Sequence, residues 1–183
     1  MVKTKMLEEV IVAGFGGQGV LSVGMLMAYS GMIEGKNVAW LPSYGPEMRG
    51  GTANCSVVIS DDLVGSPVVA EADTLIAMNG PSLDKFESQV KPGGLILVNS
   101  SLVERKVKRS DVKAFYFPVN DVASELGNLK VANMVMLGAY MALKEFPPRE
   151  AVLKSFLKVF GENKKHLLPL NEQALQKGGD LAK

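Results

Sequence analysis

Short apolar runs alternate along the chain with longer segments of helical character. The first run, Val10 to Ala13, is continuously apolar and stops at Gly14, as expected for a strand that is buried on both faces of a sheet. Similar apolar or β-branched segments predict five further strands, at residues 38–41, 52–60, 74–78, 95–98 and 114–117. Pro42 follows the second strand directly, and we expect it to end that strand.

Helices are predicted between these strands and towards the C-terminus. Residues 20–34 are rich in Leu and Met, and a second helix should begin at the Pro-Ser pair 81–82 and end at the Pro-Gly pair 92–93. Residues 131–143 are apolar around the whole helix except at Asn133, which indicates a central helix or an interface helix. Residues 149–160 form an amphipathic pattern and predict the last helix.

Strands that alternate with helices predict a single α/β domain over residues 1–183. We expect a Rossmann-like, mostly parallel sheet flanked by helices, followed by a helical C-terminal part whose last residues, GGDLAK, are frayed. Residues 10–33 carry no charge and are long enough to span a membrane. Six of these residues are glycines, four of them between positions 14 and 19, and this density argues against a membrane helix.

The glycine-rich stretch GFGGQG, residues 14 to 19, is the first candidate site. The stretch matches the motif G-x-G-x-x-G and lies between a predicted strand and a predicted helix. At such a position the main-chain amides and the positive end of the helix dipole favour binding of an anion. The candidate binding residues are therefore Gly14, Gly16, Gly17, Gln18 and Gly19. Alternatively, the glycines only permit a close turn from strand to helix.

Two common nucleotide sites fit this stretch poorly. A dinucleotide site would need an acidic residue near the end of the second strand, where the chain has Ala39, Trp40 and Leu41. A P-loop would need Lys-Ser or Lys-Thr after the glycines, and neither follows them.

The loop SYGPEMRGG, residues 43 to 51, is the second candidate site. Arg49 could hold a carboxylate or phosphate with its planar guanidinium, and Tyr44 could supply an aromatic wall, so Tyr44, Glu47 and Arg49 are the candidate catalytic residues. Both candidate loops follow strands and should share one edge of the sheet. The alternative is an exposed Glu47–Arg49 ion pair of little consequence.

Composition limits the chemistry that the chain can perform alone. The 20 Lys and Arg residues nearly balance the 19 Asp and Glu residues, which gives no indication of nucleic-acid or membrane binding. Cys55 and His166 are the only residues of their kinds, so no iron–sulfur cluster or zinc site is expected, and we expect no bound metal.

The N-terminus does not resemble a signal peptide, which favours a cytoplasmic protein. The basic segment 105–109 is either a solvated connection or a surface for phosphate or an acidic partner.

Several motifs together resemble the gamma subunit, or gamma-type domain, of the 2-oxoacid:ferredoxin oxidoreductases. They span most of the chain in order: GFGGQG at 14–19, PSYGPEMRGGTANCSVVIS at 42–60, GSP at 65–67, PSLDKF at 81–86, PGGLILVNSS at 92–101 and GNLKVANMVMLGA at 127–139. The YGPEMRGG segment is more similar to the 2-oxoglutarate enzymes than to the pyruvate enzymes.

This resemblance implies a subunit that is inactive alone. The complex would oxidatively decarboxylate a 2-oxo acid, with coenzyme A as a substrate and ferredoxin as the electron acceptor. The partners would be the alpha and beta subunits, with a delta component as a further one; thiamine diphosphate and magnesium would lie on other chains, and the iron–sulfur clusters on the beta or delta component. Two other hypotheses remain: a nucleotide-sensing module that forms a homodimer, and a purely structural interface subunit.

Overall fold

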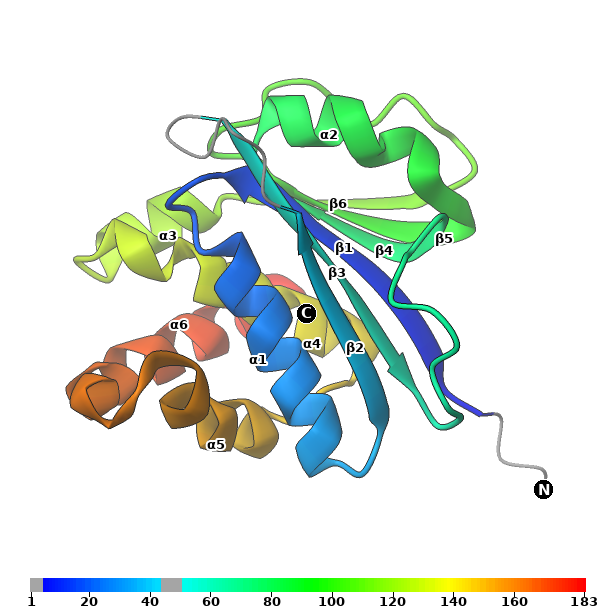
Figure 1. The fold of residues 1–183 in the computed structure, drawn as a ribbon. Helices are drawn as coiled ribbons and strands as arrows, with labels where there is room; N and C mark the ends of the chain where they lie inside the picture. Colours follow the sequence, from blue (N-terminus) through cyan, green and yellow to red (C-terminus); the bar gives the residue numbers. More distant parts are fainter. Residues whose placement is uncertain (1–4, 44–50) are drawn as a thin grey trace.

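The computed structural model describes residues 5–43 and 51–183, and in this part of the chain six strands form one sheet (Figure 1). The order of the strands across the sheet is β2-β3-β1-β4-β5-β6. Their bounds are β1 Leu7–Phe15, β2 Asn37–Ser43, β3 Thr52–Ser60, β4 Ala72–Ala77, β5 Val90–Asn99 and β6 Lys113–Phe117.

Helices cover both faces of the sheet, and most of them lie on one side (Figure 1). The helix α2 packs on one face, while α1, α3, α4, α5 and α6 lie on the other. Their bounds are α1 Val20–Ile33, α2 Gly80–Phe86, α3 Val119–Glu125, α4 Ala132–Lys144, α5 Arg149–Phe160 and α6 Leu168–Leu181, with 3-10 turns η1 Glu87–Gln89, η2 Leu129–Val131 and η3 Glu162–Leu167.

The sheet is mostly parallel, which confirms the predicted α/β class. The strand β1 pairs in parallel with β4, β4 with β5, and β5 with β6. The strand β3 is antiparallel to both of its neighbours, β1 and β2. The short connection between Ser43 and Thr52 explains this difference, because a parallel crossover needs a dozen or more residues.

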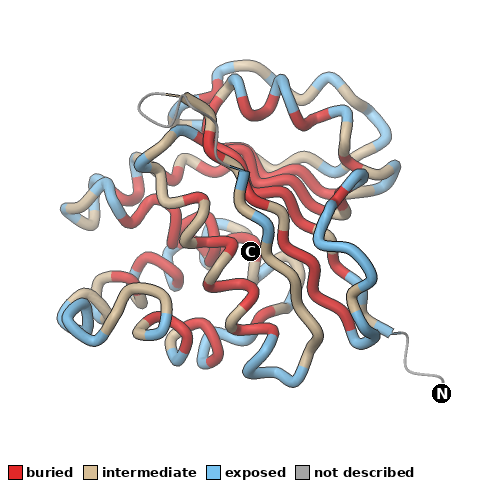
Figure 2. The backbone as a smooth tube through the Cα atoms, viewed as in Figure 1, coloured by how far each residue is buried: buried red, intermediate tan, exposed pale blue. Residues whose placement is uncertain are grey.

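Burial separates the structure into two apolar layers around the sheet (Figure 2). The larger layer contains α4, in which the residues from Ala132 to Tyr140 are all buried. Of the two alternatives predicted for the helix at 131–143, a central or an interface helix, the structure shows the central one. The smaller layer lies between the sheet and α2, where Leu83 and Phe86 pack on strand residues.

Several predicted boundaries were wrong. The first strand extends past Gly14 to Phe15, and the helix predicted as the last one, at 149–160, is followed by η3 and α6. Pro42 lies inside β2, which is an edge strand and can accommodate a residue without an amide proton. Pro92 and Gly93 lie inside β5, beside an irregularity in its pairing with β4, and the preceding helix already ends at Phe86. The tail that was expected to fray is helical as far as Leu181, because α6 packs along α4.

The uncharged stretch from residue 10 to residue 33 does not form one helix. It contains most of β1, the glycine turn and α1. Within residues 5–43 and 51–183, no helix has both the length and the apolar character that a membrane crossing requires.

Candidate functional site at the switch point of the sheet

The glycine turn lies at the point where the connections of the sheet change direction. From β1 the chain passes through α1 to β2 on one side of the sheet, whereas β4, on the other side of β1, continues through α2 to β5. Figure 1 shows α1 and α2 on opposite faces. Ligands of open α/β sheets bind at this kind of position, outside the carboxyl ends of the strands.

Two glycines of the turn adopt a left-handed backbone that favours glycine. Gly17 has a φ of 92° and Gly19 a φ of 73°, and Gly19 directly precedes α1. A Cβ on Gly19 would overlap the side-chain amide of Asn133, whereas nothing lies within 4 Å of a Cβ on Gly17. Gly19 is therefore needed for backbone conformation and for packing, and Gly17 faces open space.

Some amides of the turn already have hydrogen-bond partners. The amide of Gly16 donates to the carbonyl of Gly51 at 3.2 Å, and the amide of Gln18 donates to the carbonyl of Phe15 at 3.1 Å. Gly14 lies inside β1, where a Cβ would meet Gln18 and Val20. Among the described residues, the amides of Gly17 and Gly19 have no hydrogen-bond partner. These two are the amides of the turn that could receive an anion.

The side chain of Gln18 joins the turn to the residues that directly follow the neighbouring strand β4. Its Oε1 accepts a hydrogen bond from the amide of Phe15 at 2.6 Å, and its Nε2 donates to the carbonyl of Met78 at 3.3 Å. Asn79 also donates from Nδ2 to Gln18 Oε1, at 3.4 Å. Gln18 therefore fixes the shape of the predicted turn.

A row of carboxamides continues across the carboxyl ends of β4 and β5, and the sequence analysis missed it. Asn79 is 1% exposed and caps α2 through a bond from the amide of Ser82. Asn99 is fully buried and donates to the carbonyl of Met78 at 3.1 Å and to Oδ1 of Asn120 at 2.8 Å. The signal in the sequence was a polar residue at the end of each apolar strand.

A small pocket of about 170 Å³ opens beside the turn. Its lining includes Gly17, Gln18, Asn120 and Lys130. Lys130 is exposed and forms no ion pair with the residues that the structure describes. The pocket therefore combines an unpartnered main-chain amide, carboxamides and one free ammonium group, which suits an anionic group.

The predicted catalytic candidates Tyr44, Glu47 and Arg49 lie outside the described residues. The two flanks of their loop are described. Ser43 ends β2 opposite Asn54 of β3, and Asn54 also lies opposite Ala13 of β1. Together with the bond from Gly16 to Gly51, this pairing supports the expectation that both loops leave the same edge of the sheet.

The basic segment 105–109 is held against the protein by acidic residues. Arg105 Nη2 donates to Glu87 Oε2 at 2.8 Å, and the amides of Lys108 and Arg109 donate to Glu87 Oε1 at 2.5 and 3.2 Å. Lys106 lies over the ring of Tyr116, with 3.9 Å from Nζ to the ring centroid. These contacts stabilise the connection between β5 and β6, and acidic residues pair with Arg105 and Arg109, while the exposed side chain of Lys108 has no partner within the described residues.

Comparison with known proteins identifies the family. The chain belongs to the pyruvate ferredoxin/flavodoxin oxidoreductase family, which it matches over residues 9–181. It is 36% identical to the 2-oxoglutarate synthase subunit KorC of Methanocaldococcus jannaschii, over 99% of this chain and 97% of that protein. It is 40% identical to the ketoisovalerate oxidoreductase subunit VorA of Methanothermobacter marburgensis, over 96% of this chain. The chain spans only 36% of the length of VorA.

Solved structures agree with this assignment. The gamma subunit of a keto/oxoacid ferredoxin oxidoreductase from Geobacter sulfurreducens superimposes with a TM-score of 0.81 and 33% identity, over 96% of this chain and 98% of that one. A chain of the 2-oxoglutarate:ferredoxin oxidoreductase from Magnetococcus marinus, solved with 2-oxoglutarate, coenzyme A and succinyl-CoA bound, gives a TM-score of 0.87 and 26% identity. That match covers 98% of this chain and 31% of the other.

Proposed function

We propose that this protein is the gamma subunit of a multisubunit 2-oxoacid:ferredoxin oxidoreductase and is inactive without its partner chains. The observation that carries the proposal is the likeness over nearly the whole chain to proteins of this kind, including a gamma subunit of almost equal extent. The complex would convert a 2-oxo acid and coenzyme A to an acyl-CoA and carbon dioxide, and would pass the electrons to ferredoxin.

The substrate that we propose is 2-oxoglutarate, and ketoisovalerate is the main competitor. The similarity of the YGPEMRGG segment and the full-length likeness to KorC favour 2-oxoglutarate. The likeness to VorA, at a slightly higher identity, favours ketoisovalerate. A direct comparison of the two acids as substrates of the assembled complex decides between them.

The part of the site that this chain would supply is a contact for an anionic group of coenzyme A. The amides of Gly17 and Gly19 and the positive end of the α1 dipole meet at the turn, and Lys130 lines the adjacent pocket. At about 170 Å³ the pocket is smaller than typical small-molecule sites. It would therefore hold one phosphate group, and the rest of coenzyme A would lie on partner chains, with Arg49 as the further contact that the sequence predicts.

The other cofactors of the reaction would be bound by the partner chains. The residues of this chain do not fit an iron–sulfur cluster, because Cys55 is its only cysteine and is fully buried. Within residues 5–43 and 51–183, no three His, Cys, Asp or Glu residues are grouped so that they could hold a metal ion. As the family resemblance implies, thiamine diphosphate, magnesium and the clusters would therefore lie on the other subunits.

Reconstitution tests the proposed function. The chain is expressed with the products of its neighbouring genes, and ferredoxin reduction is measured with each 2-oxo acid and coenzyme A. We expect activity only when this chain is present. Full activity without the chain would contradict a role in the reaction.

A pair of lysine variants tests the proposed contact with coenzyme A. Lys130→Gln should raise the KM for coenzyme A about tenfold, because one charge-assisted contact to a phosphate is lost. Lys158→Gln, at an exposed position of α5, is the matched control and should leave the KM unchanged. Equal KM values in both variants would remove Lys130 from the site.

A further inference from the structure

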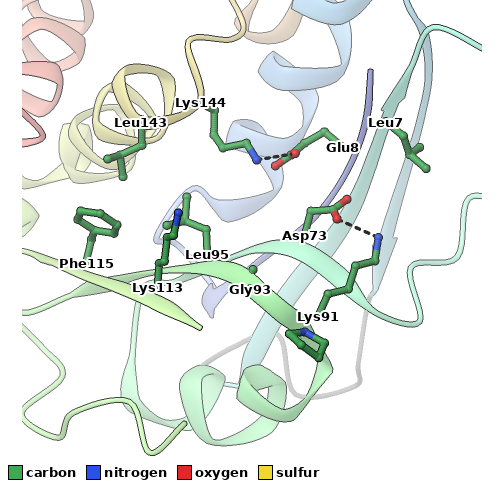
Figure 3. Close-up of a pocket in the computed structure, with 12 residues that line it drawn as sticks. Leu7, Glu8, Asp73, Lys91, Gly93, Leu95, Lys113, Phe115, Leu143 and Lys144 are labelled. Atoms are coloured by element: carbon green, nitrogen blue, oxygen red, sulfur yellow. Dashed lines mark hydrogen bonds and ion pairs between the residues drawn. The ribbon is translucent and has the colours of Figure 1, made fainter. Parts of the chain in front are cut away.

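A second pocket lies at the edge of the sheet opposite the glycine turn. It is formed by the first residues of β1, β4, β5 and β6 together with the C-terminal end of α4 (Figure 3). Its volume is about 540 Å³, which lies in the range of small-molecule sites. The proposed function makes no use of this pocket.

One wall of this pocket contains a buried carboxylate in a fixed position. Glu8 is 5% exposed, and its Oε1 accepts hydrogen bonds from Thr74 Oγ1 at 2.7 Å and from Tyr140 Oη at 3.4 Å. Its Oε2 forms an ion pair with Lys144 Nζ at 2.7 Å. Thr74 and Tyr140 are fully buried and fix Glu8, which holds the Lys144 ammonium at the wall. Within the described residues this ammonium has no other partner, so two of its three donors are available to a ligand.

The other two lysines of the pocket differ in their partners. Lys91 Nζ lies between Glu9 Oε2 at 2.6 Å and Asp73 Oδ1 at 2.9 Å, so two carboxylates already compensate its charge. Lys113, the first residue of β6, is exposed, and its side chain has no hydrogen bond or ion pair within the described residues. Lys113 is therefore the free positive charge of the pocket.

The remaining wall of the pocket is apolar. Leu95 and Phe115 come from β5 and β6, and Leu143 comes from α4. Figure 3 shows Phe115 and Lys113 on one side of the space, with Leu143 and Lys144 across from them. A ligand could thus place an anionic group between two ammonium groups and hydrocarbon against an aromatic ring and a leucine.

The charges of the residues that line the pocket favour a ligand that carries a single carboxylate group. A phosphate ester or a dicarboxylate would bring additional negative charge close to Glu8 and Asp73, and Lys113 is the single lysine here without an acidic partner. We propose that this pocket is a binding site for a small monocarboxylic acid with an apolar chain, separate from the switch-point site. The carboxylate would lie between Lys113 and Lys144, and the chain would lie against Phe115 and Leu143.

Titration calorimetry of the full chain tests this site with 3-methylbutanoate and, as an uncharged analogue of the same shape, 3-methylbutanamide. We expect the acid to bind at millimolar concentration and the amide to bind much more weakly. Inorganic phosphate should not displace the acid. Equal binding of acid and amide, displacement by phosphate, or no binding of the acid would overturn the proposal.

Variants of Lys113 locate the site, and they should fold normally because this side chain has no partner to lose. Lys113→Gln should weaken binding of the acid about tenfold. Lys113→Arg should retain most of the affinity, because it keeps the positive charge. The control Lys158→Gln lies on α5 and should bind like the unaltered chain. If Lys113→Gln binds the acid as the unaltered chain does, the site is not the one described.

Discussion

Gly138 of α4 and Gly178 of α6 lie where the two helices make backbone contact. A Cβ on Gly138 would overlap the carbonyl group of Leu175, and a Cβ on Gly178 would overlap the carbonyl group of Val135. The closest atoms at both positions belong to backbone, which cannot move aside as a flexible side chain can. The two glycines therefore determine how closely α6 lies against the buried helix α4.

Gly178→Ala should destabilise the protein by about 1–3 kcal/mol, because overpacking outweighs the gain in helix propensity. Gly179→Ala is the matched control, since its Cβ would lie 3.7 Å from the carbonyl oxygen of Gly138, an ordinary contact. That variant should be unchanged or more stable by up to about 1 kcal/mol. Urea denaturation measures both free energies of unfolding. Equal stability of the two variants would show that α6 can shift at no cost.

Gln18→Glu separates the two hydrogen-bonding functions of this side chain. A carboxylate can still accept from the amide of Phe15, but it cannot donate to the carbonyl of Met78. We expect a loss of about 1–2 kcal/mol in stability and, in the assembled complex, a higher KM for coenzyme A because of the added negative charge. Gln173→Glu, at an exposed position of α6, is the control. A normal KM in a destabilised Gln18→Glu variant would restrict Gln18 to a structural role.

The fold followed from the sequence more completely than the site did. The bounds of β3 and α5 match the predicted ranges because both segments have a clear pattern of buried residues and distinct ends. The glycine turn between the first strand and the first helix was also predicted correctly, although Gly14 and Phe15 still belong to β1. These features depend on neighbours in the sequence.

The parts that sequence reasoning missed depend on distant contacts. Glu8 looks like a solvent-exposed residue at the start of a strand, but Tyr140 and Lys144 enclose it from a helix more than 130 positions away. The partners of Gln18 that follow β4, Met78 and Asn79, are about 60 positions away. Local periodicity carries no information about such pairs, so neither the carboxamide row nor the second pocket could be derived from it.

The contribution of Glu87 to the free energy of unfolding should depend on pH. Burial alone would raise the pKa of Glu87, but the hydrogen bonds from Arg105 and from the amides of Lys108 and Arg109 lower the pKa below its ordinary value. A carboxyl group whose pKa is lower in the folded state stabilises the protein above its unfolded pKa, about 4.3. This contribution is lost as the pH falls further, through the pKa of the folded state.

Glu87→Gln should therefore be less stable by about 1–3 kcal/mol at neutral pH, and the difference from the unaltered chain should shrink below about pH 4. Free energies of unfolding measured across this range check the expectation. Glu104→Gln, at an exposed position of the connection between β5 and β6 that Glu87 contacts, should show no such pH-dependent difference. A difference for Glu87→Gln that stays constant with pH would mean that packing, and not ionisation, is responsible.

Cys55 should not react with thiol reagents while the protein is folded. The side chain is fully buried, and burial raises the pKa of its thiol to about 12 from an ordinary value of 9.0. A rise of this size lowers the thiolate fraction about a thousandfold at any pH below both values. The variant Ser124→Cys places a second thiol at an exposed position of α3. With a disulfide reagent at mildly alkaline pH, we expect one thiol of this variant to react at once and the other to react only after denaturant is added. Rapid reaction of both thiols without denaturant would show that α1 moves away from β3 readily in the folded protein and exposes Cys55.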